Sequence, residues 1–186
     1  MAIIVTYRRT RRLSMRIVKN GDVHVSVPIG IPKREVEAFI EKSRDWMASA
    51  RQKTTELQRQ RTAFYSQMQL DTPAKRRDAV KRLQAFVTPL LQQHAAEMGV
   101  QPTAICFRSS TTRWGSCNYL TGRISFSLYL LLLPNWCIEH IVVHELAHLL
   151  VPNHSPAFYE VMDRYFPRWR EARSETRRLS LNAGEE

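Results

Sequence analysis

Residues 141–150 of the chain read IVVHELAHLL, an H-E-x-x-H motif embedded in apolar residues. The apolar positions from 138 to 149 follow helical spacing, and prolines at both ends bound the segment, so we predict a helix. His144 and His148, four residues apart, project from one face of this helix and could reach the same zinc ion. Glu145 lies about 100° around the helix from His144. Its carboxylate is therefore expected beside the metal, where it could take a proton from bound water.

A catalytic zinc needs a third protein ligand, and we expect it at His154. A Pro-Asn pair follows the predicted helix and lets the chain fold back toward the metal. His140 lies one turn before the motif, but it would be about 12 Å from His148 along the helix axis, too far to share an ion. Glu160 and Asp163, one helix later, are alternative carboxylate ligands.

The order of elements predicts an α+β fold rather than alternating βαβ units. Alternating apolar residues around Asn20-Gly21 predict a β-hairpin over residues 13–27. The polar stretch 51–69 is either an extension of the helix before it or a connector. The other expected elements are helices over 33–50 and 73–98, the second kinked or broken at Pro89; strands over 103–107 and 123–133, with a link at 118–122; a helix over 135–151; and two short helices after Ser155 and Pro167.

A second signature stands at residues 112–117, which read TRWGSC. Together with HELAHLL and Asn153-His154-Ser155, it resembles the YgjP-like metal-dependent hydrolases, compact zincin metallopeptidases related to SprT-like proteins. The hairpin (16–28) and the Asp45-Trp46-Met47 run also fit, so the resemblance covers most of the chain. It is weak only in the polar stretch 51–69.

The resemblance implies a zinc ion held by His144, His148 and His154, with Glu145 as the catalytic acid/base. It also implies a minimal zincin-like metallopeptidase fold, in which a small, mainly antiparallel sheet packs on the H-E-x-x-H helix. We accordingly divide the chain into a basic N-terminal hairpin and helix at 1–70 and a zincin-like catalytic domain at 71–186, together one compact protein.

The TRWGSC run has two interpretations. In the first, Trp114 is a core residue and Gly115 permits a bend or bulge in a strand. In the second, the strand edge lies beside the metal and binds an extended substrate, with Arg113 facing its anionic part. Cys117 is not expected to be a nucleophile or ligand, because nothing in the sequence lowers its pKa. Tyrosines that could stabilise an oxyanion are Tyr119, Tyr129 and Tyr159, and the sequence does not choose among them.

Composition indicates a globular protein: of 186 residues, 44% are hydrophobic and 24% charged. No apolar run approaches the roughly 18 residues of a membrane-spanning helix, and the N-terminal apolar stretch precedes its charges, the reverse of a signal peptide. Three widely spaced cysteines argue against a disulfide framework. We therefore expect a soluble cytoplasmic protein without a membrane partner.

The chain carries a net charge of +11, and its basic residues are concentrated near the N-terminus. Residues 1–34 hold eight Lys or Arg and one acid, and 98–138 contain no acid. Such clusters suit polyanions, so nucleic acid is a possible partner, although charge alone is equally compatible with a solvated surface. The cluster that we expect to bind it comprises Arg8, Arg9, Arg11, Arg12 and Arg16.

These features together predict a zinc-dependent hydrolase, most simply a metallopeptidase acting on peptides or proteins, with Zn²⁺ as cofactor and Glu145 as general base. The first alternative is a nucleoside triphosphate pyrophosphatase that uses the same zinc site, since some YgjP-like members are described so and the arginine excess suits a nucleotide. The second is a nucleic-acid-binding protein with structural zinc. It is disfavoured because no cysteine ligands complete a closed site.

Overall fold

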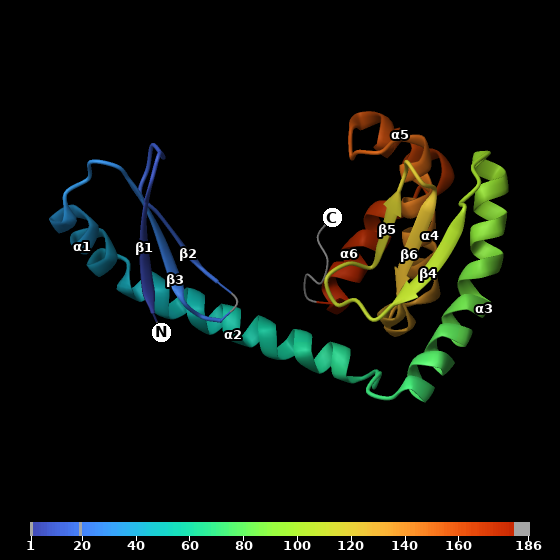
Figure 1. Cartoon of the computed structure of the whole chain (residues 1–186), viewed down its shortest axis with the longest axis horizontal. Helices are drawn as coiled ribbons and strands as arrows, with labels where there is room; N and C mark the ends of the chain where they lie inside the picture. Colours follow the sequence, from blue (N-terminus) through green and yellow to red (C-terminus); the bar gives the residue numbers. More distant parts are fainter. Residues whose placement is uncertain (1, 19, 181–186) are drawn as a thin grey trace. The chain divides into compact units, whose positions relative to one another are not determined.

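The computed structural model describes residues 2–18 and 20–180, and the chain divides into two compact units (Figure 1). Unit 1 is Met1–Thr62 and unit 2 is Ala63–Glu186. Our division at residues 70 and 71 stays a prediction, since compactness does not test which part folds alone. None of the described helices combines the length and the apolar composition that a membrane span requires.

Unit 1 contains a three-stranded sheet in the order β1-β3-β2. The predicted hairpin is confirmed: β2 (Ser14–Ile17) and β3 (Val23–Pro28) pair antiparallel. The turn between them includes Gly21, whose φ of 81° is a conformation that glycine adopts without strain. The sequence did not predict β1 (Ile3–Arg8), which pairs parallel with β3. Strands β1 and β3 are separated in the chain by β2, so no turn motif in the sequence indicates that they pair.

Two helices follow the sheet in place of the one expected over 33–50. α1 (Lys33–Lys42) ends at Ser43, whose hydroxyl donates to the Phe39 carbonyl at 2.7 Å, and α2 (Arg44–Ser66) begins directly after it. The polar stretch is therefore an extension of the helix and not a connector. The core of unit 1 joins one face of β3 to both helices, through Val23, Val25, Val27, Val36 and Met47.

Unit 2 has a second three-stranded sheet and four α-helices among its described residues. Its elements are α3 (Pro73–Met98), β4 (Ala104–Arg108), β5 (Gly115–Asn118), β6 (Arg123–Ser127), the 3₁₀-helix η1 (Leu128–Leu132), α4 (Asn135–Leu150), α5 (Pro156–Tyr165) and α6 (Trp169–Ser180). The strand expected over 123–133 is shorter because the Ser127 side chain accepts from the Tyr129 amide at 3.2 Å and opens the 3₁₀ turn.

The sheet of unit 2 is mixed, whereas we expected a mainly antiparallel one. Its order is β4-β6-β5: β5 and β6 form an antiparallel hairpin, and β4 pairs parallel with the other edge of β6. The chain reaches β6 only after the intervening β5 has reversed its direction, so β4 and β6 point the same way. This order leaves β5 as an edge strand.

α3 is continuous through Pro89, where we expected a kink or break. Pro89 and Ala85, whose carbonyl loses its helical partner, are both exposed, so water can satisfy that carbonyl. On the opposite face, Leu83, Val87 and Leu91 are buried in the core and hold the helix in place. The expected ends are confirmed: Thr72 caps the first turn, and Gly99 closes the helix at a φ of 67°.

α4 is the central helix of unit 2. It contacts α3, α5, α6 and β5, and Figure 1 shows it behind the sheet with α3 alongside. Its buried residues cover most of its circumference, as expected for a helix enclosed by other elements. The H-E-x-x-H motif occupies its second half, so the surrounding packing fixes the orientation of the motif side chains.

Candidate active site

Three imidazoles converge at the C-terminal end of α4. His144 and His148 lie one turn apart on α4, and His154 lies in the segment between α4 and α5. Their candidate ligand nitrogens all lie within 4.8 Å of one another. The Nε2 atoms of His144 and His154 are 3.2 Å apart. Two nitrogens that each lie about 2.0–2.1 Å from a tetrahedral zinc are about 3.3 Å apart, so this spacing fits such an ion.

A backbone contact orients His148. Its Nδ1 atom lies 3.3 Å from the Val151 carbonyl oxygen. That carbonyl only accepts, so the contact favours the tautomer with the proton on Nδ1 and makes Nε2 the candidate metal ligand. The carbonyl is available because Val151 is the C-terminal cap of α4, with extended backbone.

The Phe158 ring packs against all three imidazoles. Its ring centroid lies 5.0 Å from that of His144 and 4.7 Å from those of both His148 and His154, and its side chain is 1% exposed. The sequence placed Phe158 only on the apolar face of a short helix. Its position four residues after His154, on the helix that follows, was the only signal of a closer role.

Glu145 is buried against the first residue of β5. The side chain is 1% exposed. A Cβ atom built on Gly115 would lie 2.6 Å from its Cγ and Cδ atoms, so only glycine fits there without a shift. Gly115 thus allows the strand backbone to approach the carboxylate closely. We had expected this glycine to permit a bend or bulge in the strand, whereas its role here is the close approach.

A cavity of about 260 Å³ joins these groups to the TRWGSC run. It is lined by Arg113, Ser116, Cys117, Glu145, His148, Pro152 and His154. Burial and the Glu145 charge raise the pKa of Cys117 to about 11, so its thiol is neutral. An exposed cation, a neutral thiol, a buried carboxylate and imidazoles therefore border the same space, beside the edge strand β5.

Comparison with known protein families shows to which family the chain belongs. The family described as YgjP-like, metallopeptidase domain, matches residues 11–72 and 69–179. The chain belongs to this YgjP-like family. It is accordingly a metal-dependent hydrolase of the peptidase kind. Among solved structures, that of the metallopeptidase zymogen of Pyrococcus abyssi abylysin is similar, with 23% identity and a TM-score of 0.49 over 53% of this chain and 99% of that chain. The comparison with curated proteins gave no match.

The alternative ligands of this YgjP-like chain lie outside the imidazole cluster. Within residues 2–18 and 20–180, only one group of three or more His, Cys, Asp or Glu side chains could hold a metal ion, and it consists of His144, His148 and His154. His140 is buried with its ring 6.0 Å from that of His144, and burial lowers its pKa to about 3, so it is neutral. Asp163 accepts hydrogen bonds from Arg170 and Trp169, both at 2.7 Å, which hold its pKa below the usual value.

The three candidate tyrosines differ in their surroundings. Tyr119 is 53% exposed in the β5–β6 turn, and Tyr129 packs edge-on against Tyr65 with ring centroids 4.8 Å apart. Tyr159 stacks between His154, at 6.4 Å, and Trp169, at 5.0 Å. Tyr159 is therefore the tyrosine that the fold brings next to a candidate ligand.

Proposed function

We propose that this chain is a zinc-dependent peptidase in which His144, His148 and His154 hold the ion. The convergence of the three imidazoles supports this, and it is the observation on which the proposal rests. The Val151 carbonyl, which contacts His148, and the Phe158 ring, which packs against all three imidazoles, favour it further, because they help to fix the ring orientations.

A bound zinc ion would lower the pKa of its water toward about 7 and polarise the scissile carbonyl. Glu145 would act as general base, taking the proton from that water and passing it to the amine that leaves. Its burial against Gly115 supports this role, since a carboxylate held by packing is pre-positioned for proton transfer. The neutral Cys117 thiol in the same cavity would not compete as a nucleophile.

The edge strand β5 would orient the peptide. Ser116 and Cys117 of this strand line the cavity, and β6 occupies only one of its two edges. An extended peptide can add to such an edge through main-chain hydrogen bonds, which bind many sequences. Side-chain preference would then come from the cavity, where Arg113 favours an anionic group.

Arg113 also supports the second candidate, hydrolysis of a nucleoside triphosphate. A guanidinium beside the cavity suits a phosphate as well as a carboxylate. Peptide hydrolysis remains the primary proposal because the family is a peptidase family.

A substrate screen on zinc-loaded protein separates the two candidates. A quenched-fluorescent peptide library and the four common nucleoside triphosphates are incubated with wild-type protein, with Glu145→Gln as the blank. We expect peptide cleavage that the blank lacks and that Arg113→Gln shifts away from acidic peptides. Release of pyrophosphate without peptide cleavage would overturn the peptidase proposal and favour the nucleotide.

A further inference from the structure

The sheet of unit 1 has one face that the hydrophobic core leaves uncovered. Side chains alternate between the two faces of a strand. The three valines of β3 are at most 1% exposed and belong to the core, whereas the alternate residues His24, Ser26 and Pro28 are only partly buried. Among the described residues, none on this second face joins the core. We call it the outer face of unit 1.

The strand register brings hydroxyl and cationic side chains together on the outer face. The residues side by side across β1, β3 and β2 are Ile4, His24 and Arg16 in one row and Thr6, Ser26 and Ser14 in the next, while Arg8 lies beside Pro28. Neighbouring strands are about 4.8 Å apart and successive rows about 6.6 Å. Closely spaced hydroxyl and guanidinium groups are typical donors to phosphate oxygens.

The loop after β1 extends this basic surface. Residues 2–18 contain five arginines and no acid, and all five are exposed. Within the described part of the chain, none of the five has an ion-pair partner. Three cations on the helices of unit 1, by contrast, are paired: Lys33 with Glu37 at 3.7 Å, Arg44 with Glu41 at 2.7 Å, and Arg59 with Glu56 at 3.2 Å.

The charge of the whole chain follows the same division. Residues 1–62 carry 14 Lys or Arg against 6 Asp or Glu, a net charge of +8, whereas the longer unit 2 carries +3. The excess is thus concentrated in the unit that lacks the imidazole cluster.

We propose that the outer face of unit 1, with its arginine loop, binds nucleic acid through the phosphate backbone. Its guanidiniums suit bidentate contact with phosphate, and its hydroxyls add neutral donors. Among the described residues, no Phe, Tyr or Trp stands on this face, since Tyr7 shares the register of the buried valines, and His24 is the one aromatic ring there. A single imidazole offers bases little stacking area, so phosphate contacts dominate and binding is largely independent of sequence.

An anionic membrane fits this surface less well. Interfacial binding needs apolar side chains that enter the headgroup region together with the cations. The outer face offers one exposed apolar side chain, Ile4, because Ile3 and Val5 lie on the opposite face. Hydroxyl groups occupy the positions that a membrane-binding face would fill with apolar residues.

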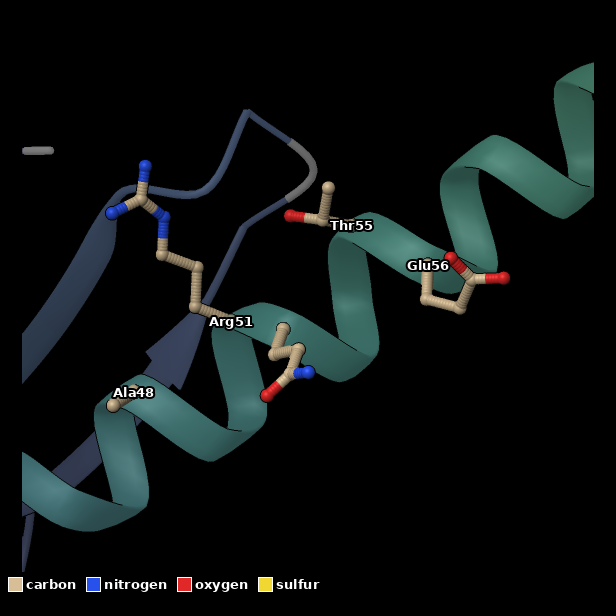
Figure 2. Close-up of a pocket in the computed structure, with 5 residues that line it drawn as sticks. Ala48, Arg51, Thr55 and Glu56 are labelled. Carbon is tan, nitrogen blue, oxygen red and sulfur yellow. The ribbon is translucent and has the colours of Figure 1, made fainter.

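A hollow on α2 does not extend the surface. It is lined by Ala48, Arg51, Gln52, Thr55 and Glu56, and Figure 2 shows Arg51 reaching from the helix toward the strands. One cation and one anion balance its charge, and Glu56 also accepts from Gln60 at 2.7 Å. The phosphate contacts are therefore assigned to the outer face and its loop alone.

Fluorescence anisotropy with the full-length protein tests this surface. The probes are a labelled single strand and a labelled duplex, each of about 20 nucleotides or base pairs and of mixed sequence, titrated from about 50 to 200 mM salt. The triple variant Arg8→Gln/Arg12→Gln/Arg16→Gln is compared with Lys33→Gln/Arg44→Gln/Arg59→Gln. Both variants remove the same charge from unit 1, but the control removes only ion-paired helical cations.

We expect affinity that falls steeply with salt. The outer-face variant should weaken binding at least about 10-fold and reduce the slope of log K against log salt by about 2 to 3, because each lost phosphate contact contributes about 0.7–0.9. The control should change affinity by less than about 3-fold. Equal losses in both variants would overturn the proposal, since net charge alone would then explain binding. Tighter binding to phosphatidylserine vesicles or to polyglutamate would also overturn it.

The result does not depend on the proposed hydrolysis. Glu145→Gln should bind the same probes as the wild-type protein, because Glu145 lies in unit 2. A loss of probe binding in this variant would contradict the assignment to the outer face. An inactive enzyme with intact probe binding would contradict only the proposed function.

Discussion

The backbone of Gly115 lies against the side chain of Glu145, close enough that a Cβ atom at residue 115 would stand 2.6 Å from the Glu145 Cγ and Cδ atoms. These residues are thirty positions apart, one at the start of β5 and the other the second residue of the H-E-x-x-H motif. The contact joins the two signatures of the sequence at one point. It also fixes the distance between the edge strand and the carboxylate.

Gly115→Ala should therefore impair both stability and activity. The backbone of Gly115 is not in the left-handed region, so alanine introduces a steric clash and no φ strain. Overpacking of a core typically costs about 1–3 kcal/mol. We expect a loss of that size in the free energy of unfolding, measured by urea denaturation, and at least a 10-fold loss of kcat as Glu145 is displaced. Zinc content should be unchanged.

A double variant separates this clash from a general defect of β5. In Gly115→Ala/Glu145→Ala the carboxylate is absent, so the added methyl group has room. The two substitutions should then be non-additive, with the second recovering much of the stability that the first removes. Equal destabilisation by Gly115→Ala with and without Glu145 would show that the close contact is not the cause.

Zinc binding should depend on three histidines and not on a fourth. We expect about one zinc per chain after gel filtration, measured by plasma mass spectrometry and removable by a chelator. His144→Ala, His148→Ala and His154→Ala should each lower this content strongly. His140→Leu is the matched control on the same helix, because His140 is buried and neutral and leucine keeps the site apolar. Full retention of zinc by His154→Ala would redirect the search to Glu160.

The histidine cluster could be predicted from sequence because its information is local. The four-residue spacing within α4 fixes the faces of His144 and His148, and the Pro-Asn pair lets the chain return with His154. The hairpin of unit 1 could be predicted for the same reason, since its turn residues and its alternating apolar residues lie within fifteen positions of the sequence.

The missed features depend on contacts between distant segments. β1 pairs with β3 across about twenty residues and the intervening β2, so neither its existence nor its parallel direction has a local signal. The role of Gly115 depends on a helix thirty residues later, and that of Phe158 on three imidazoles from two segments. A glycine in a strand indicates close approach, but the sequence does not name the group that approaches.

Cys117 should be slow to alkylate although it borders the cavity. Burial, with a smaller contribution from the Glu145 charge, raises the pKa of its thiol to about 11. Against an ordinary cysteine this lowers the thiolate fraction about 300-fold, and the higher intrinsic reactivity of the thiolate recovers about 10-fold. Iodoacetamide labelling at pH 7.5, followed by peptide mass spectrometry, should therefore be roughly 10- to 30-fold slower at Cys117 than in urea-unfolded protein. Labelling at the unfolded rate would contradict the burial of this thiol.

Glu145→Gln separates a catalytic zinc from a structural one. Glutamine keeps the shape of the side chain against Gly115, so the variant should fold and hold zinc at the wild-type ratio. It cannot accept a proton at neutral pH, and positioned proton transfer typically contributes about 10²–10⁴-fold to a rate. We expect kcat/KM to fall by at least about two orders of magnitude with zinc content unchanged. The loss should appear with peptide or nucleotide substrates, because both reactions need activated water. A variant that kept zinc and hydrolysed at the wild-type rate would remove Glu145 from the mechanism, and a variant that lost zinc together with activity would make the carboxylate part of the metal site instead of the base beside it.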